Sequence, residues 1–265
     1  MLLEEIATTI GLTIDQPFTM ILIVIIGYLL INEAIFAKAL MLLLFTMVYN
    51  TFLKAHWQIP LPPASGLEGW AFPSGHMHSA FVFWGWLAFD SKNRYLMALI
   101  FVLLSFTGFG LVHRGYHYPL DIVGAVCFGA VTLTIFHVIN LFEPFKNKYM
   151  LNGLWLSLAA LFFILITPEI GRKIHIYQGL GALIGFTVGG LYAANRQNMT
   201  TGKLKEIGAA ILTIFVSILI FKGFDMIPLE LPKSIMLFLM WFFIAFWVAG
   251  SKRVLRMPAA FFKFT

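Results

Sequence analysis

Long apolar stretches separated by short polar loops run through most of the chain. A helix needs about 20 apolar residues to cross the hydrocarbon core of a bilayer. The stretches that approach or reach this length are residues 11–31, 34–53, 76–90, 95–112, 118–141, 151–167, 175–195, 206–222 and 233–250. The pattern therefore predicts an all-α fold, a polytopic membrane bundle of about nine transmembrane helices.

The polar intervals leave no room for a soluble domain. The longer ones are residues 54–75, 142–150, 196–205 and 223–232. We divide the chain into residues 1–145, a helical core that carries the candidate chemistry, and residues 146–265, additional transmembrane helices to which the sequence assigns no role. In the second part, the glycines between Gly179 and Gly190 have the small-residue spacing that favours close helix packing.

The composition supports a membrane protein. Sixty per cent of the residues are hydrophobic and 11% are charged, whereas soluble domains carry about 25% charged residues. The mean hydropathy is +0.88. The net charge of +6 comes from basic residues in short loops, so we expect the bilayer as a partner and no nucleic acid. Cys127 is the single cysteine, which excludes a disulfide within one chain.

The basic residues also predict an orientation. If the loops alternate between sides, 12 of the 18 Lys and Arg residues fall on one side and six on the other. Cytoplasmic loops are the richer ones in Lys and Arg. Both loops with candidate chemistry, 54–75 and 113–117, lie on the poorer side. We therefore expect a protein of the bacterial inner (plasma) membrane whose site faces the periplasm or the cell exterior, with the N-terminus outside and the C-terminus inside.

The first chemical motif is Pro73-Ser74-Gly75-His76, directly ahead of an apolar helix. The first turn of a helix has free backbone N–H groups and a partial positive charge, and both favour a bound anion. Ser74 can cap the helix or donate a hydrogen bond, Gly75 allows a close approach of the backbone, and His76 stands beside the anion. The same tetrapeptide also fits an ordinary helix cap followed by an interfacial histidine.

The second motif is a histidine and a carboxylate four residues apart, His117 and Asp121. If Pro119 lies in the first turn of a helix, the two share a face. A carboxylate that binds one ring nitrogen fixes the tautomer and leaves the other nitrogen free to attack. The alternative is an aspartate that only complements the helix N-terminus. Lys54 ends the second apolar stretch, and by itself it fits a lysine reaching the membrane surface.

Together these residues resemble the three motifs of the membrane branch of the type 2 phosphatidate phosphatase superfamily. The second family motif, Pro-Ser-Gly-His, is complete at residues 73–76. The third, Ser-Arg-x5-His-x3-Asp, matches at His117 and Asp121, and the first, Lys-x6-Arg-Pro, matches at Lys54 and Pro62.

The resemblance covers about residues 20–140 and has two departures. The arginine of the first family motif falls on Leu61, and the Ser-Arg pair of the third falls on Gly110 and Leu111. In the family both arginines bind the phosphate, so the resemblance implies a site with fewer cations. Arg114 lies about one helical turn after Leu111, and we expect its guanidinium to bind the phosphate instead.

The resemblance implies a lipid phosphatase, a metal-independent hydrolase of phosphoric monoesters or diphosphates. His117 would attack phosphorus and form a phosphohistidine, Asp121 would orient the ring, and His76 would protonate the leaving oxygen and then activate water. The phosphate would be bound by Lys54, Ser74, Gly75 and Arg114. We expect no metal and no cofactor.

The substrate implied by the resemblance is a lipid phosphate: phosphatidate, phosphatidylglycerol phosphate or undecaprenyl pyrophosphate. The sequence does not choose among them, and it leaves the oligomeric state open. A lipid phosphotransferase using the same phosphohistidine is an alternative, because relatives that transfer headgroups often lack the phosphate-binding Lys and Arg. A catalytically weakened lipid-binding or transport protein is another, motivated by the two missing arginines and the additional helices.

Overall fold

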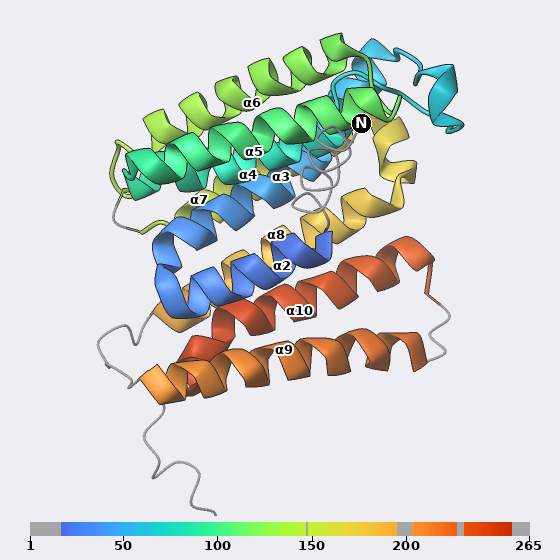
Figure 1. Cartoon of the computed structure of the whole chain (residues 1–265). Helices are drawn as coiled ribbons and strands as arrows, with labels where there is room; N and C mark the ends of the chain where they lie inside the picture. Colours follow the sequence, from blue (N-terminus) through green and yellow to red (C-terminus); the bar gives the residue numbers. More distant parts are fainter. Residues whose placement is uncertain (1–16, 147, 195–202, 227–230, 256–265) are drawn as a thin grey trace, which may run out of the picture.

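The computed structural model describes residues 17–146, 148–194, 203–226 and 231–255, and the regular structure in these ranges is helical (Figure 1). The long helices are α2 (Pro17–Ile26, continued by the π-helical turn Gly27–Ile31), α3 (Glu33–Trp57), α4 (Gly75–Ser91), α5 (Arg94–His113), α6 (Pro119–Ile139), α7 (Leu151–Ile166), α8 (Ile174–Ala194), α9 (Lys203–Met226) and α10 (Lys233–Leu255). The short 3-10 helices are Pro63–Ser65 and Pro168–Arg172. Each predicted apolar stretch coincides with a helix, except that residues 11–16 and 195 lie outside the described residues.

Six of these helices are long and apolar enough to cross a membrane, namely those built on α3, α5, α6, α8, α9 and α10. The other three are shorter: α4 has 17 residues, α7 has 16, and α2 depends on its π-helical turn for length. Large apolar side chains such as Phe101, Leu158 and Ile211 are exposed on the outer faces, where lipid would cover them. The chain is thus an integral membrane protein with an all-α bundle, while nine crossings stay a prediction.

Helix α3 is at the centre of the packing, because α4, α7 and α8 all contact it. Its fully buried residues Met41 and Leu42 belong to the same hydrophobic core as Leu183 and Phe186 of α8. The two sequence parts, 1–145 and 146–265, therefore share one continuous core, which places residues of the second part next to α3.

Helices α8 and α10 make the most intimate contact in the bundle, side by side in Figure 1. Gly181, Gly185 and Gly189 recur every four residues on α8, and a Cβ atom at any of them would press into a backbone carbonyl oxygen of α10. Their partners on α10 are Phe238, Phe242 and Phe246. The small residues thus let two backbones approach closely, as the sequence predicts for this stretch.

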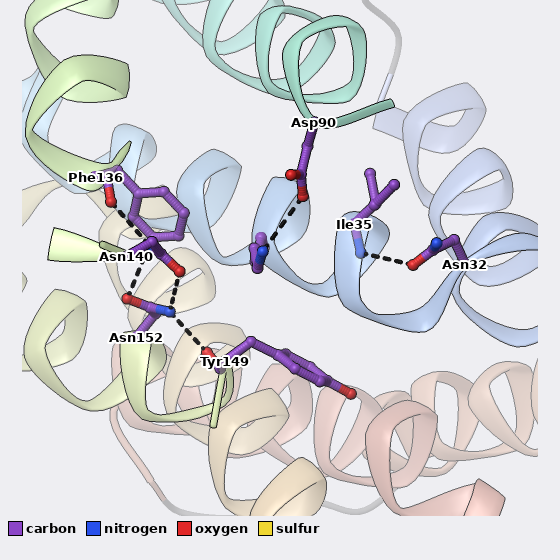
Figure 2. A network of polar contacts seen from close by, with 8 residues as sticks. Asn32, Ile35, Asp90, Phe136, Asn140, Tyr149 and Asn152 are labelled. Atoms are coloured by element: carbon purple, nitrogen blue, oxygen red, sulfur yellow. Dashed lines mark hydrogen bonds and ion pairs between the residues drawn. The ribbon is translucent and has the colours of Figure 1, made fainter. Parts of the chain in front are cut away.

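The loops alternate between the two ends of the bundle, so the loops of residues 58–74 and 114–118 lie at the same end (Figure 1). Figure 2 shows polar contacts between the helix ends on the other side, where the amides of Asn140 and Asn152 pair at 3.2 and 3.0 Å. Asn32, drawn in the same view, caps α3. Lys38 forms an ion pair with Asp90 at 3.3 Å. These contacts fix the helix ends opposite the candidate site.

Candidate functional site

The loop between α3 and α4 folds back on itself as a short hairpin. The amide of Ala71 donates to the carbonyl oxygen of Ile59 at 2.6 Å, and that of Leu61 donates to Gly69 at 3.1 Å. These backbone bonds bring residues 71–74 back to the C-terminal end of α3. They also place Leu61, which stands at the position of the first family arginine, inside the hairpin.

The end of this hairpin is fixed against α6. The ring of Phe72 occupies the space that a Cβ atom at Gly124 would take, so this glycine allows the ring to lie directly on the α6 backbone. The amide of Ser74 donates to the carbonyl oxygen of Asp121 at 3.1 Å. The first and second candidate motifs are therefore joined by a direct backbone hydrogen bond.

Ser74 and Gly75 build the start of α4. Ser74 is fully buried, and its hydroxyl oxygen accepts a hydrogen bond from the amide of Met77 at 3.4 Å, which is the ordinary helix cap. A hydroxyl that accepts one bond still has its proton to donate. A Cβ atom at Gly75 would lie 3.1 Å from the side-chain oxygen of Asn50 and 4.0 Å from Cε of Lys54. Gly75 therefore permits the start of α4 to lie against α3.

Asn50 is a site residue that the sequence analysis missed. Its side-chain amide donates to the carbonyl oxygen of Pro73 at 3.3 Å and lies 3.2 Å from Nδ1 of His78. Asn50 and His78 are both buried. A polar residue inside an apolar span is costly unless it has partners. The position of Asn50 within the stretch 34–53 was therefore the sequence signal that could have indicated its role. Since Asn50 and Lys54 are four residues apart, one face of α3 holds the Pro-Ser-Gly turn.

His117 and Asp121 are in contact, as their spacing predicts. His117 Nδ1 lies 3.2 Å from the Asp121 carboxylate, and the same carboxylate oxygen accepts from the amide of Tyr118 at 2.8 Å. The side chains are only 6% and 2% exposed. The Asp121 carboxylate therefore makes both of the contacts considered for it: it caps α6 and it binds the His117 ring. A proton on Nδ1, shared with the carboxylate, leaves the lone pair on Nε2.

Lys54 links the two motifs electrostatically. Its ammonium group donates to the carbonyl oxygen of Trp70 at 2.7 Å, and its charge acts on the rings of both His76 and His117. The charge of His76 also acts on the ring of His117. We call Lys54, His76, His117 and Asp121 the His–Lys cluster. In it His117 is buried and His76 is exposed, so one imidazole is protected from water and the other is open to the surface.

The protonation of His117 follows from its surroundings. It lies between α5 and α6, and burial lowers its pKa to about 4, with the Lys54 ammonium acting in the same direction. The hydrogen bond and the charge of Asp121 act in the opposite direction without cancelling the effect of burial. A histidine with a pKa well below 7 is neutral at physiological pH, which is the form that attacks as a nucleophile.

Leu111, at the position of the second family arginine, and Arg114, its expected replacement, differ in exposure. Leu111 is fully buried in the core, and its carbonyl oxygen accepts from the amides of Tyr116 and His117 at 3.0 and 3.3 Å. Arg114 is the C-cap of α5, and its side chain is exposed with no hydrogen bond or ion pair to the rest of the described chain. The structure therefore does not attach Arg114 to the His–Lys cluster, and its role as a phosphate ligand stays a prediction.

Two residues beyond the family-like region also reach this end of α3. Nε2 of His175, at the start of α8, lies 2.9 Å from the hydroxyl oxygen of Thr51. The charge of Lys173 acts on Lys54. The Thr51–His175 contact and the effect of the Lys173 charge on Lys54 each join segments more than 100 residues apart, so no local sequence pattern predicts them. Comparison of the chain with protein-family models, with curated proteins and with solved structures finds no match.

Proposed function

We propose that this protein is a membrane lipid phosphatase of the type 2 phosphatidate phosphatase kind. In this proposal it has nine membrane crossings and lies in a bacterial inner membrane, with the His–Lys cluster facing the periplasm or the exterior. The observation that supports it best is the buried His117, hydrogen-bonded to Asp121 and under the charge of Lys54, with His76 beside it. These are the groups that a phosphohistidine mechanism needs.

The proposed reaction has two steps. Nε2 of His117 attacks phosphorus, the bond from phosphorus to the leaving oxygen breaks, and His76 gives that oxygen a proton. His76 then takes a proton from a water molecule that attacks the phosphohistidine, which releases inorganic phosphate and restores His117. Asp121 stabilises the positive ring in between.

The charge on the phosphate oxygens needs donors that are already in place. Lys54, the Ser74 hydroxyl and the Gly75 N–H group supply them in this proposal, together with Arg114; the Ser74 N–H is already bound to Asp121. The His–Lys cluster lies at the ends of the helices and not in the middle of the bundle. A lipid headgroup would therefore enter from the aqueous side while its tail stays among the apolar helices. This arrangement supports a lipid substrate over a soluble phosphate ester.

The lipid phosphotransferase is the second candidate, and one observation favours it. The buried Leu111 leaves no cation where the family has an arginine, and transferring relatives often lack such cations. Both reactions form the same phosphohistidine and differ only in the group that receives the phosphoryl group, which is water in one and an alcohol or second lipid in the other.

Release of inorganic phosphate by the purified protein distinguishes these functions. We expect phosphate from at least one member of a panel of phosphatidate, phosphatidylglycerol phosphate and undecaprenyl pyrophosphate in detergent micelles, without an added acceptor. Turnover that begins only when an acceptor lipid is added would establish the transferase. Saturable binding of these lipids without any turnover would overturn both enzymatic functions.

The lowered pKa of His117 gives a pH prediction. An ordinary histidine with a pKa of about 6.5 is about nine-tenths protonated at pH 5.5 and so loses most of its nucleophilic form. His117, with a pKa of about 4, stays neutral over this range. We expect the single-turnover rate of phosphoenzyme formation to fall less than about twofold from pH 7 to pH 5.5. A fall of about tenfold in a rapid-quench experiment would contradict the low pKa.

A further inference from the structure

The corner between α7 and α8 is held against α3 close to the His–Lys cluster. The hydroxyl group of Thr51 donates to the carbonyl oxygen of Met47 at 2.8 Å, so its proton is already used. At 2.9 Å from the same oxygen, Nε2 of His175 is therefore the donor. Thr51 lies three residues before Lys54, which is about one helical turn. This bond places the start of α8 one turn from the lysine of the cluster.

The backbone of Lys173 is anchored in the same corner. The flanking side chains of Ile170 and Ile176 are both fully buried. The backbone of Lys173 is also fixed, because its amide donates to Ile170 at 2.9 Å and its carbonyl oxygen accepts from Ile176 at 3.1 Å. The Lys173 side chain itself is exposed. The backbone of Lys173 is thus held at a defined place, and its ammonium group is open to solvent.

Charges from both the His117–Asp121 pair and the α7–α8 corner act on Lys54. The charges of Asp121 and Lys173 both act on Lys54. The charges of Lys173 and Lys54 also act on His175, the second basic residue of the corner. His117, in contrast, is under the charges of Lys54, Asp121 and His76. Lys54 is thus influenced both by Asp121, the partner of His117, and by Lys173, whose corner is bonded to α3 one turn away at Thr51. Two ammonium groups at the same end of α3 repel each other, and an anion bound by both would relieve that repulsion.

We propose that Lys54 and Lys173 form a second anion subsite beside His117, with His175 as the residue that positions Lys173. The inference rests on the proposed function and specifies its substrate. The ligand is a phosphate oxyanion next to the phosphate that His117 attacks, supplied either by the substrate itself as a diphosphate or by free inorganic phosphate. The subsite gives residues 146–265 a role in the chemistry and supplies a cation that Leu61 and Leu111 do not.

The test compares a lipid diphosphate with the monophosphate that carries the same tail, undecaprenyl pyrophosphate and undecaprenyl phosphate. We expect Lys173→Gln to lower the diphosphate-to-monophosphate ratio of kcat/KM about tenfold, through KM, with kcat changed less than twofold. His175→Ala should lower the ratio in the same direction. His175→Gln should restore it, because its amide can still donate to Thr51. Lys222→Gln, an exposed lysine on α9, is the control and should leave the ratio unchanged.

Binding measurements separate this inference from the proposed function. Titration of the His117→Ala protein with pyrophosphate and with inorganic phosphate needs no turnover. We expect Lys173→Gln to weaken pyrophosphate binding about tenfold and phosphate binding much less; equal weakening of both ligands would mean that the subsite takes free phosphate. Unchanged affinity for both, or an equal effect of Lys222→Gln on the pyrophosphate preference, would overturn the subsite while leaving the phosphatase intact. Loss of pyrophosphate binding in a protein that hydrolyses no lipid would leave the subsite and remove the phosphatase.

Discussion

Replacing His117 with alanine is expected to abolish turnover of lipid phosphates, by about 10⁴-fold or more, because it removes the atom that attacks phosphorus in the proposed reaction. The ring is buried and bound to Asp121 at 3.2 Å, so no neighbouring side chain can take its place without moving. The measurement is the initial rate of phosphate release by purified protein. Trapping of acid-labile phosphate on the protein provides the second readout, and His117→Ala should show none.

His113→Ala is the matched control for this prediction. His113 is a second histidine at the end of α5, exposed and stacked on Phe109 at 5.4 Å between ring centroids. It should retain activity within about twofold of the wild type. Both variants should elute from detergent gel filtration as the wild type does, which separates lost chemistry from lost folding. A labelled phosphoenzyme in His117→Ala would assign the nucleophile to another residue, His76 first.

The fold was largely predictable because the bilayer imposes one rule on every span. Apolar stretches must become helices, since lipid offers the backbone no hydrogen-bond partner. Helix ends were less predictable, because caps and not hydropathy determine them. The stretch expected at 34–53 is a helix from Glu33 to Trp57, beginning at the Asn32 cap and ending where Gln58 turns to a φ of 50°. Polar residues thus continue the helix beyond the apolar stretch.

The candidate site was predictable only where it is local in sequence. The contact between His117 and Asp121 follows from a four-residue spacing on one helix. The bond of Asn50 to Pro73 joins α3 to the loop before α4, and the bond of Thr51 to His175 joins α3 to α8; no periodicity encodes either of them. The burial of Leu111 belongs to the same class, because it depends on which face of α5 meets the core.

The largest structural effect is expected at Gly185, where α8 and α10 touch through their backbones. A Cβ atom there would press into the carbonyl oxygen of Phe242, which cannot move unless α10 moves with it. Overpacking of this kind costs about 1–3 kcal/mol. We therefore expect Gly185→Ala to lower the thermal unfolding midpoint in detergent by about 5 °C, and Gly185→Leu to lower it further.

The control for Gly185 is another helical glycine, Gly223 on α9, because a Cβ atom built there would meet no described atom within 4 Å beyond its own helix backbone and chain neighbours. Gly223→Ala should leave the midpoint unchanged or raise it, since alanine favours a helix. An equal decrease in both variants would mean that glycine itself, and not the contact with Phe242, is what matters.

The Gly185→Ala change should also lower activity toward lipid diphosphates, because α8 begins beside Lys173. A Gly185→Ala protein that is still folded at the assay temperature should therefore use lipid diphosphates less well than the Gly223→Ala protein does.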